Sequence, residues 1–374
     1  MLAPVFDILN CGPRRRFVVN GKLVHNSEKV NLQNLQRTSK KDPDVGLLRK
    51  AIMAPPGNRL VVTDYAQIEA RMLVWMARQM DKVKAFAEGR DVYSEQASVI
   101  YGRKVDRRAN PDDFVPGFIG KAVVLGAGYG LGYLKFARMI YVGMLGEKGI
   151  LFDDSYVDAL GVDPSTWRAR KELREEEWER ILAAQPLSLT LDEWLKHCSV
   201  ADKIIRVFRE SNPKIIDFWS TCNSAIEAMF EGEEFAFGGP TGALLTTARH
   251  AINLPNGMQI RYEGLERDKK GQYSFLRRKE GRIQRVKVYG GAVTENVDQA
   301  LSRIPTTNLM LKADALGMDV VLQSHDEVGV VVPEDDAEAA FDWMIGTMRK
   351  VPKWATGLPL NAEGGIGVRY GDIK

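Results

Sequence analysis

The sequence predicts an α+β fold, in which strands and helices are largely separated along the chain. Two short apolar segments with strand character, residues 60–63 and 320–332, lie on either side of a long stretch at 91–250 that is mostly helical in pattern. Apolar runs between polar turns are typical of strands, whereas apolar residues three and four positions apart are typical of helices. The expected order is therefore a strand and a helix, a large helical insertion, and then strands again.

Length and composition indicate a soluble protein of more than one lobe. The chain has 374 residues, more than a single hydrophobic core usually supports. Its hydrophobic content of 45% and charged content of 27% are ordinary for a globular protein. No apolar run approaches the roughly 18 residues of a membrane span, and the first residues lack a secretory pattern. Together with three widely spaced cysteines, these features predict a cytoplasmic location without a membrane partner.

The net charge of +3 is unevenly distributed. Residues 1–26 hold four basic side chains and one acidic side chain, so residues 27–374 sum to zero. A neutral body gives no global electrostatic reason to expect a nucleic-acid partner. Any such binding must come from local patches.

The elements expected at the front of the chain are short. Residues 17–19 have a β pattern that leads into Asn20-Gly21, a typical hairpin turn. Residues 29–56 are polar and loop-like. The buried strand at 60–63 then leads into a helix expected over residues 68–86.

Later elements follow from the same patterns. The dense charges of a helix expected at 166–184 fit a solvated face better than a binding surface. The pattern at 201–230 predicts an amphipathic helical stretch that is interrupted at Asn212-Pro213. The pattern becomes β-like at 259–262 and 285–289.

A further helix over residues 294–303 is expected to end at Pro305, because proline has no N–H for the helical hydrogen-bond series. The hairpin at 320–332 and a helix at 337–348 complete the chain.

Carboxylates stand at the ends of two strands. Asp64 follows the apolar residues 60–63, and Asp326-Glu327 stand at the tip of the hairpin at 320–332. Carboxylate oxygens are ligands that Mg²⁺ shares with water and substrate phosphates, and two such ions can stabilise the attacking and leaving oxygens of a phosphoryl transfer. If the strands lie side by side, Asp64 and Asp326 meet at one divalent-metal site. For either aspartate alone, a role as a strand-end or turn residue would be the favoured explanation.

Three segments carry a resemblance to a known family. Residues 64–71, DYAQIEAR, resemble motif A of the family A DNA polymerases, the DNA polymerase I family, with alanine in place of a serine. Residues 120–130, GKAVVLGAGYG, resemble motif B, and residues 325–327, HDE, match motif C. The segment VNLQNL at 30–35 is also similar to the family. With a phage-type segment after Tyr289 and the C-terminal residues, the resemblance extends from residue 27 to 374 in the family's order.

The resemblance implies a palm of antiparallel sheet and helices with a mostly α-helical fingers insertion. Residues 27–80 would form the first part of the palm, 81–255 the fingers and 256–374 the second part of the palm. The implied activity is template-directed addition of deoxynucleotides to a primer 3′-hydroxyl. Its implied partners are primer-template DNA and deoxynucleoside triphosphates, and its cofactors are two Mg²⁺ ions, for which Mn²⁺ is a possible substitute.

The resemblance also implies residue roles. The catalytic and metal-binding residues would be Asp64, Tyr65 through its carbonyl, Asp326 and, as a supporting carboxylate, Glu327. The nucleotide-binding residues would be Gln67, Glu69, Lys121, Leu125 and Tyr129. The DNA-binding residues would be Asn31, Gln33, Asn34, Gln299 and His325, although a turn-stabilising role for His325 is an equal alternative.

Motif B is expected to present one helical stripe. Lys121, Leu125 and Tyr129 are four residues apart, so a continuous helix would place them on one face. Lys121 would meet the triphosphate and Tyr129 the nascent base pair. Gly117 departs from the family, which usually has an arginine there. Either Arg107 or Arg108 substitutes from nearby, or nucleotide binding is weaker.

Two other interpretations of these segments are disfavoured. The glycines at 126–132 do not follow a strand and lack the spacing of a dinucleotide-binding loop. In the related single-subunit RNA polymerases the sugar-gating position would differ, whereas Glu69 here would crowd the 2′ position and reject ribonucleotides.

Residues 1–26 look like the C-terminal end of an intein, with the splice junction between Asn26 and Ser27. An asparagine amide can close a ring on its own carbonyl and cleave the chain, His25 would polarise the bond, and Ser27 would accept the acyl group. Asp7 matches a position that is often acidic in inteins. The alternative is an ordinary β-hairpin that ends in His-Asn-Ser.

The intein resemblance predicts a split protein. A separate polypeptide would carry the N-terminal halves of the polymerase and the intein, and trans-splicing would join the two chains. In the alternative function, this chain is a catalytically inert splicing precursor or replication-complex module until it is ligated.

Overall fold

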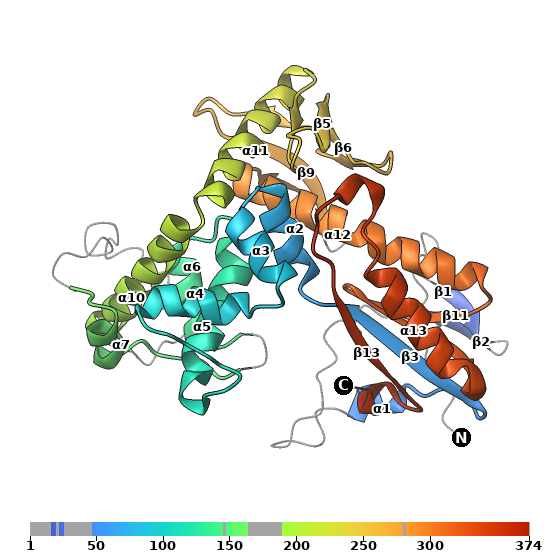
Figure 1. Cartoon of the computed structure of the whole chain (residues 1–374). Coiled ribbons are helices and arrows are strands. Elements are labelled where there is room, and N and C mark those ends of the chain that lie inside the picture. Colours follow the sequence, from blue (N-terminus) through green and yellow to red (C-terminus); the bar gives the residue numbers. More distant parts are fainter. Residues whose placement is uncertain are drawn as a thin grey trace. The chain divides into compact units, whose positions relative to one another are not determined.

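The computed structural model describes residues 16–19, 22–25, 47–144, 147–163, 189–279 and 282–373. The chain divides into two compact units (Figure 1). Unit 1 combines Met1–Glu69 with Gln299–Lys374, and unit 2 is Ala70–Asp298. The predicted α+β class is confirmed, because antiparallel sheets and helices occur together in the described chain. None of the described helices has the length and apolarity needed to cross a membrane.

Unit 1 is built on a four-stranded antiparallel sheet. Its strands in spatial order are β11 (Asp319–Ser324), β12 (Glu327–Pro333), β3 (Asn58–Tyr65) and β13 (Ala362–Gly367). The two strands expected from the sequence are therefore direct neighbours at the centre of the sheet, although they are far apart in the chain.

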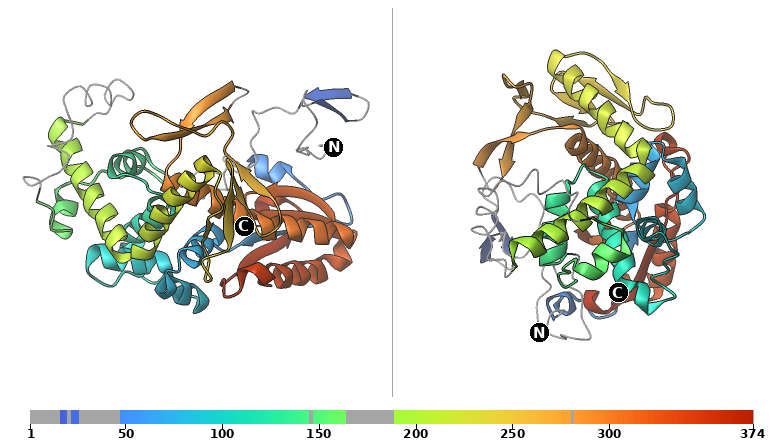
Figure 2. Two further views of the ribbon diagram at one scale, coloured as in Figure 1. Left: turned by 90° about the horizontal axis from the view of Figure 1, so that it is seen from above. Right: turned by 90° about the vertical axis from the view of Figure 1, so that its left-hand side faces the viewer.

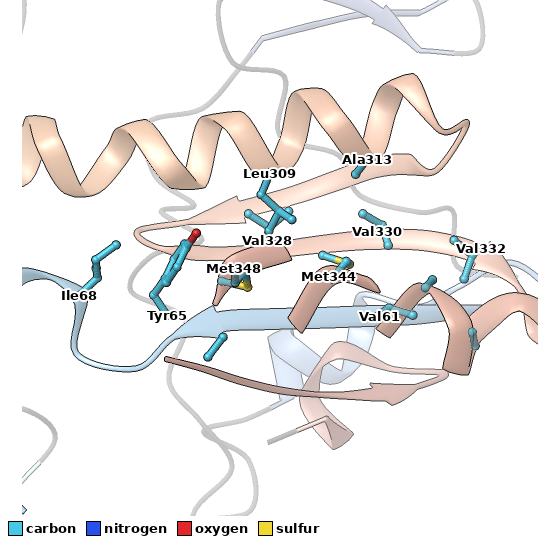
Figure 3. Packing of buried hydrophobic residues seen from close by; sticks show 13 residues of the cluster. Val61, Tyr65, Ile68, Leu309, Ala313, Val328, Val330, Val332, Met344 and Met348 are labelled. Atoms are coloured by element: carbon cyan, nitrogen blue, oxygen red, sulfur yellow. The ribbon is translucent and has the colours of Figure 1, made fainter. Parts of the chain in front are cut away.

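One face of this sheet is covered by helices α12 (Gly290–Ala315) and α13 (Ala337–Met348). Figure 3 shows Leu309 of α12 and Met344 of α13 packed with Val61 and Val330 of the sheet. A smaller cluster that includes Leu60 and Tyr370 fills the opposite face. Because side chains alternate along a strand, Asp64 lies on the face of Leu60.

Smaller elements complete unit 1. Helix α1 (Leu47–Ala51) lies within the stretch expected to be a loop, so that expectation is wrong at this point. The predicted N-terminal hairpin is present, with β1 (Arg16–Val19) paired antiparallel to β2 (Lys22–His25). Three short 3₁₀ helices are η5 (Glu334–Asp336), η6 (Lys353–Ala355) and η7 (Tyr370–Asp372).

Unit 2 is mostly helical, as predicted for the insertion. Its helices are α2 (Ile68–Met76, which begins in unit 1), α3 (Met80–Ala87), α4 (Val92–Tyr101), η3 (Pro111–Asp113), α5 (Phe114–Ala127), α6 (Tyr133–Val142), α7 (Asp154–Ala159), α10 (Leu191–Ser211) and α11 (Pro213–Glu231). The predicted interruption at Asn212-Pro213 is confirmed. The charged helix expected at 166–184 lies outside the described residues.

Two antiparallel sheets belong to unit 2. The first contains β4 (Ala236–Phe237), β5 (Leu245–Ala248), β6 (Ala251–Asn253) and β7 (Gln259–Arg261). The second contains β8 (Glu266–Arg267), β9 (Tyr273–Lys279) and β10 (Arg282–Lys287) in the order β10-β9-β8. The strands β7 and β10 confirm the two β patterns predicted after His250.

The helix expected over residues 68–86 is two helices. Arg78 has a φ of +61°, in the left-handed region, and the chain turns there between α2 and α3. Gln79 stabilises the break, because its side-chain Oε1 accepts a hydrogen bond of 3.0 Å from the Lys214 N–H. The apolar spacing predicted helical structure correctly, but it could not predict the turn at Arg78, which depends on the contact between Gln79 and the distant Lys214.

The helix expected to end at Pro305 continues through it to Ala315. Proline removes one N–H donor and usually kinks or ends a helix. Here Leu309 and Ala313, both beyond the proline, are buried against the sheet. Tertiary packing of that second half outweighs the single lost hydrogen bond.

His197 of α10 is fully buried in unit 2. Its Nδ1 accepts a hydrogen bond of 2.9 Å from the Phe152 N–H, and its Nε2 lies 2.8 Å from the Ala137 carbonyl oxygen. The ring also packs against Trp194 and Tyr141. Burial lowers the pKa of His197 from 6.5 to about 4, so the neutral ring is the folded form.

We therefore predict a loss of stability in mild acid. The unfolded state binds a proton at His197 below pH 6.5, whereas the folded state does so only near pH 4, so stability falls as the pH decreases through this window. The contribution is about 3 kcal/mol. Urea unfolding between pH 7.5 and 4 should show it as the difference between the wild type and His197→Gln. The control His250→Asn, at a left-handed turn residue that asparagine tolerates, should keep the wild-type pH dependence.

Candidate active site

The pairing of β3 with β12 places the carboxylates of unit 1. Glu327 is the direct cross-strand partner of Asp64. Strand β11 ends at Ser324 and β12 begins at Glu327, so the tight turn between them consists of His325 and Asp326. His325 has a φ of +54°, in the left-handed region used by short hairpin turns. The turn therefore holds Asp326 at the same end of the sheet as Asp64.

Asp64 and Asp326 are in contact through a side-chain hydrogen bond. Burial raises the pKa of Asp326 to about 8, and the charges of Asp64 and Glu69 contribute further. Burial, followed by the charge of Asp326, also raises the pKa of the Tyr65 hydroxyl. Two carboxyl groups that share a hydrogen bond must keep a proton between them or gain a cation.

The donor set fits a hard divalent cation. Asp64 and Asp326 supply carboxylate oxygens, and the backbone carbonyl of Tyr65 belongs to the same strand end as Asp64. Within the described parts of the chain there is no group of three or more His, Cys, Asp or Glu side chains that could hold a metal ion. An ion held by these two aspartates would therefore take its other ligands from water and from a bound substrate, as Mg²⁺ commonly does.

Glu327 has a different environment from the two aspartates. Its side chain is buried, with a residue exposure of 6%, and accepts a hydrogen bond from the Tyr370 hydroxyl. The Arg49 Nη2 lies 3.9 Å from the Glu327 Oε1, and the Arg49 guanidinium lies 3.9 Å from the centre of the Tyr370 ring. We call Arg49, Glu327 and Tyr370 the buried triad. It fixes the Glu327 carboxylate directly across the sheet from Asp64.

The residues after Asp64 form a second turn. Gln67 has a φ of +59°, and the preceding Ala66 N–H donates to the Asn361 carbonyl at 2.9 Å. Glu69 is exposed in the first turn of α2, and its charge contributes to the raised pKa of Asp326. Gln67 and Glu69 therefore belong to the same unit as the aspartate pair.

Motif B in unit 2 differs from the expected single stripe. Lys121 and Leu125 lie one turn apart on α5, but the helix ends at Ala127 and Tyr129 belongs to the following turn. Gly128, the first residue after the helix, is held by contacts with other helices. Its backbone packs so closely on Leu73 that an added Cβ would lie 2.5 Å from a Leu73 methyl, and its carbonyl accepts a 2.8 Å hydrogen bond from Trp219.

Tyr129 is held by a residue that the sequence did not indicate. Its hydroxyl donates a 2.5 Å hydrogen bond to Oδ2 of Asp298, a fully buried residue of α12. Gly130, the next residue, has a φ of +80°, which a glycine adopts without strain. No motif or spacing connects these residues, so only the folded chain brings them together.

The structure explains Gly117. An added Cβ at this position would lie 2.4 Å from the Cβ of Arg107, so the Arg107 side chain occupies the space above the glycine. Arg107 Nε also lies 2.7 Å from the Asp91 Oδ2, and its guanidinium packs over Tyr93. Of the two arginines expected to replace the family arginine, Arg107 is therefore the one beside Gly117.

Of the remaining predicted site residues, the structure describes the side chains of two, Gln299 and His325. Gln299 is exposed on α12, and His325 is exposed in the hairpin turn. The residues that lie outside the described part of the chain are Asn31, Gln33, Asn34, Asp7, Asn26 and Ser27, together with the side chain of His25.

Comparisons with known proteins agree with the motifs. Residues 17–159 match the family model of DNA polymerase family A. The DNA polymerase of Bacillus phage SP02 is 24% identical over 325 residues, which are 85% of this chain and 42% of the phage protein. DNA polymerase I of Chloroflexus aurantiacus is 31% identical over 117 residues, or 30% of this chain and 11% of that protein.

A solved structure has a similar fold. The POL domain of Pol1 from M. smegmatis, in complex with DNA primer-template and dNTP, matches with a TM-score of 0.51 at 17% identity. The match covers 94% of this chain and 46% of that chain. At this identity the likeness concerns the fold alone. The chain spans less than half the length of each of these three relatives.

The buried triad gives a prediction about stability. Arg49→Met would leave the buried Glu327 charge without its cation and should lower the free energy of unfolding by about 3–5 kcal/mol. Tyr370→Phe removes one hydrogen bond to that charge and should cost about 1–3 kcal/mol. The control is Arg59→Met, which breaks a more exposed ion pair to Glu334 and should cost under about 1 kcal/mol. Urea unfolding measures all three, and equal costs for the Arg49 and Arg59 variants would contradict the triad.

Proposed function

We propose that this chain, a homologue of the family A DNA polymerases, carries the nucleotidyl-transfer site of a DNA-directed DNA polymerase. In this reaction the primer 3′-oxygen forms a bond to the α-phosphorus of a deoxynucleoside triphosphate, and the bond to pyrophosphate breaks. The observation that carries the proposal is the contact between Asp64 and Asp326 at the ends of adjacent strands. Primer-template DNA and deoxynucleoside triphosphates are the proposed partners, in the cytoplasm of a host cell.

In the proposed site, Asp64 and Asp326 hold Mg²⁺, with the Tyr65 carbonyl as a further oxygen ligand. Two such ions, or Mn²⁺ in their place, would supply positive charge for the attacking and leaving oxygens of an in-line displacement. Glu327 supports the site, because the buried triad fixes its carboxylate across the sheet from Asp64. A cation would also offset the burial, and then the repulsion from Asp64, that raise the pKa of Asp326.

The substrate contacts follow from the family resemblance. Lys121 is proposed to neutralise the triphosphate as a point charge. Glu69 is proposed to exclude the ribose 2′-hydroxyl. The other proposed nucleotide contacts are Gln67, Leu125 and Tyr129, and the proposed DNA contacts are Asn31, Gln33, Asn34, Gln299 and His325. Arg107, which lies over Gly117, is proposed to supply the charge of the usual family arginine.

Residues 1–26 have a separate proposed function in protein splicing. The observation in its favour is the antiparallel hairpin β1–β2, which ends at His25, directly before the proposed junction of Asn26 and Ser27. Asp7 is the proposed acidic residue of this segment. The proposed partner is a second polypeptide that carries the N-terminal halves of the intein and of the polymerase. In the alternative function, this chain would be inert as a polymerase until it is ligated.

We predict that, in the ligated polymerase, Asp64→Asn and Asp326→Asn each lower primer extension by a factor on the order of 10³, because each removes a ligand that positions the charge of a metal ion. Primer-template binding should stay near the wild-type level. The control Asp319→Asn, an exposed carboxylate at the other end of β11, should extend normally. Full extension by both active-site variants would refute the site.

Metal binding can be tested without polymerase activity, so the test also applies if the isolated chain is an inert precursor. Mg²⁺ should raise the melting temperature of the wild-type chain and of Asp319→Asn, but not that of Asp64→Asn or Asp326→Asn. If the isolated wild type does not extend a primer but shows this metal dependence, the alternative of an inert precursor is favoured. An equal Mg²⁺ effect on all four chains would count against a metal site at the aspartate pair.

The splicing proposal predicts a new covalent product. Mixing this chain with a polypeptide that carries the N-terminal halves should release residues 1–26 and yield a ligated polymerase that begins its C-terminal part at Ser27. Asn26→Ala should block that release, since alanine has no amide to cyclise. Mass spectrometry detects both species. An unchanged mass after mixing would assign residues 1–26 to an ordinary hairpin.

A further inference from the structure

The sheet formed by β8, β9 and β10 concentrates positive charge. Residues 266–289 contain nine Lys and Arg and three Asp and Glu, a balance of +6. Because residues 27–374 sum to zero, the rest of that range has a balance of −6. The sheet is therefore a local basic patch on a chain that is otherwise slightly acidic after its first 26 residues.

One face of the hairpin β9–β10 anchors it to its own unit. Phe275 makes an edge contact with the buried Tyr262, with ring centres 5.0 Å apart, and Tyr273 does the same with Phe230 at 5.7 Å. Val288, which follows β10, is also buried. The base of the hairpin is thus fixed by packing, and Figure 2 shows the orange strands extending away from the helices of unit 2.

The opposite face and the distal part of the hairpin are exposed and cationic. Arg278 is the cross-strand partner of Ile283, which is 65% exposed, and Lys287 is the partner of Ser274. Arg277 and Arg282 are exposed on the same two strands. Arg285 pairs with Glu266 at 3.1 Å.

The ion pair of Arg285 distinguishes it from three other arginines of the hairpin, Arg277, Arg278 and Arg282. No carboxylate among the residues that the structure describes forms an ion pair with any of the three. All three side chains are exposed to solvent.

We propose that the hairpin β9–β10 binds the phosphate backbone of duplex DNA through Arg277, Arg278 and Arg282. The inference deepens the proposed function, on which it rests for the identity of the partner. A two-stranded β-ribbon fits the width of the major groove, and phosphates are the anions that arginine binds best. The cores of protein interfaces are depleted in charge, so a ribbon with this many exposed cations matches DNA better than a protein surface.

The proposed contact is independent of DNA sequence. Cations that meet phosphates release the counterions of DNA, which makes binding depend steeply on salt and gives no preference among bases. On this chain, whose charge outside the patch is unfavourable for DNA, the hairpin would supply the local electrostatic attraction to duplex DNA.

The test compares two triple variants of the full chain. Arg277→Gln, Arg278→Gln and Arg282→Gln together remove the proposed contacts. The matched control is Lys84→Gln, Lys104→Gln and Lys148→Gln, three exposed cations elsewhere in unit 2 that change the net charge equally. Fluorescence anisotropy with a labelled primer-template duplex is measured from 50 to 300 mM salt. Thermal melting verifies that both variants fold.

The hairpin variant should lose about 2.7 from the slope of log affinity against log salt, because each phosphate contact contributes about 0.9. Its affinity near 0.1 M salt should fall roughly 100-fold. The control should keep the wild-type slope. An equal slope for the two triple variants would overturn the proposal, and so would hairpin-dependent binding of polyglutamate without binding of DNA. If the triple variant fails to fold, Arg278→Gln alone should lower the slope by about 0.9, and an unchanged slope would refute the contact.

The result is separable from the catalytic proposal. Asp64→Asn should keep the wild-type salt slope while extension is lost. The hairpin variant should instead retain the wild-type extension rate at saturating primer-template. A ligated wild-type polymerase that binds DNA through the hairpin but never extends a primer would refute the catalytic proposal and leave this inference standing.

Discussion

Electrostatic repulsion between two carboxylates is the constraint on which the proposed site depends. The antiparallel pairing of β3 with β12 brings Asp64 and Asp326 into contact, although water would keep two such charges apart. The folded protein tolerates the pair by keeping Asp326 protonated, as its raised pKa indicates. Folding thus keeps two carboxyl groups at one site, where a divalent cation could replace the proton that they share. Such a site is costly for stability and useful for chemistry.

The rest of unit 1 holds this strand pairing in place. Apolar side chains of α12 and α13 cover one face of the sheet, and the buried triad ties Glu327 to the N-terminal α1 and the C-terminal η7. Arg49 and Tyr370 therefore connect α1 and η7 to the strand that pairs with β3 at Asp64. In unit 2 the contacts of Tyr129 with Asp298 and of Arg107 with Gly117 fix the motif B region in the same manner.

Charge has two separate roles in this chain. At the aspartate pair, two half-buried carboxyl groups in contact form a site that a cation would stabilise. On the hairpin β9–β10, exposed arginines favour the binding of an anion. The aspartate pair belongs to unit 1 and the hairpin to unit 2. A net charge near zero conceals both, because a sum over the chain carries no information about where charges gather.

The sequence by itself determined the α+β class, the strands at 60–63 and 320–332, and the carboxylates at their ends, because these depend on local periodicity and short motifs. It predicted wrongly where α2 and α5 end, and that α12 would stop at Pro305, because distant contacts decide those boundaries. Only the tertiary structure decided that Arg49 and Tyr370 meet at Glu327, or that Tyr129 meets Asp298. The two residues of this last contact are 169 positions apart, and no pattern along the chain encodes which side chains folding brings together.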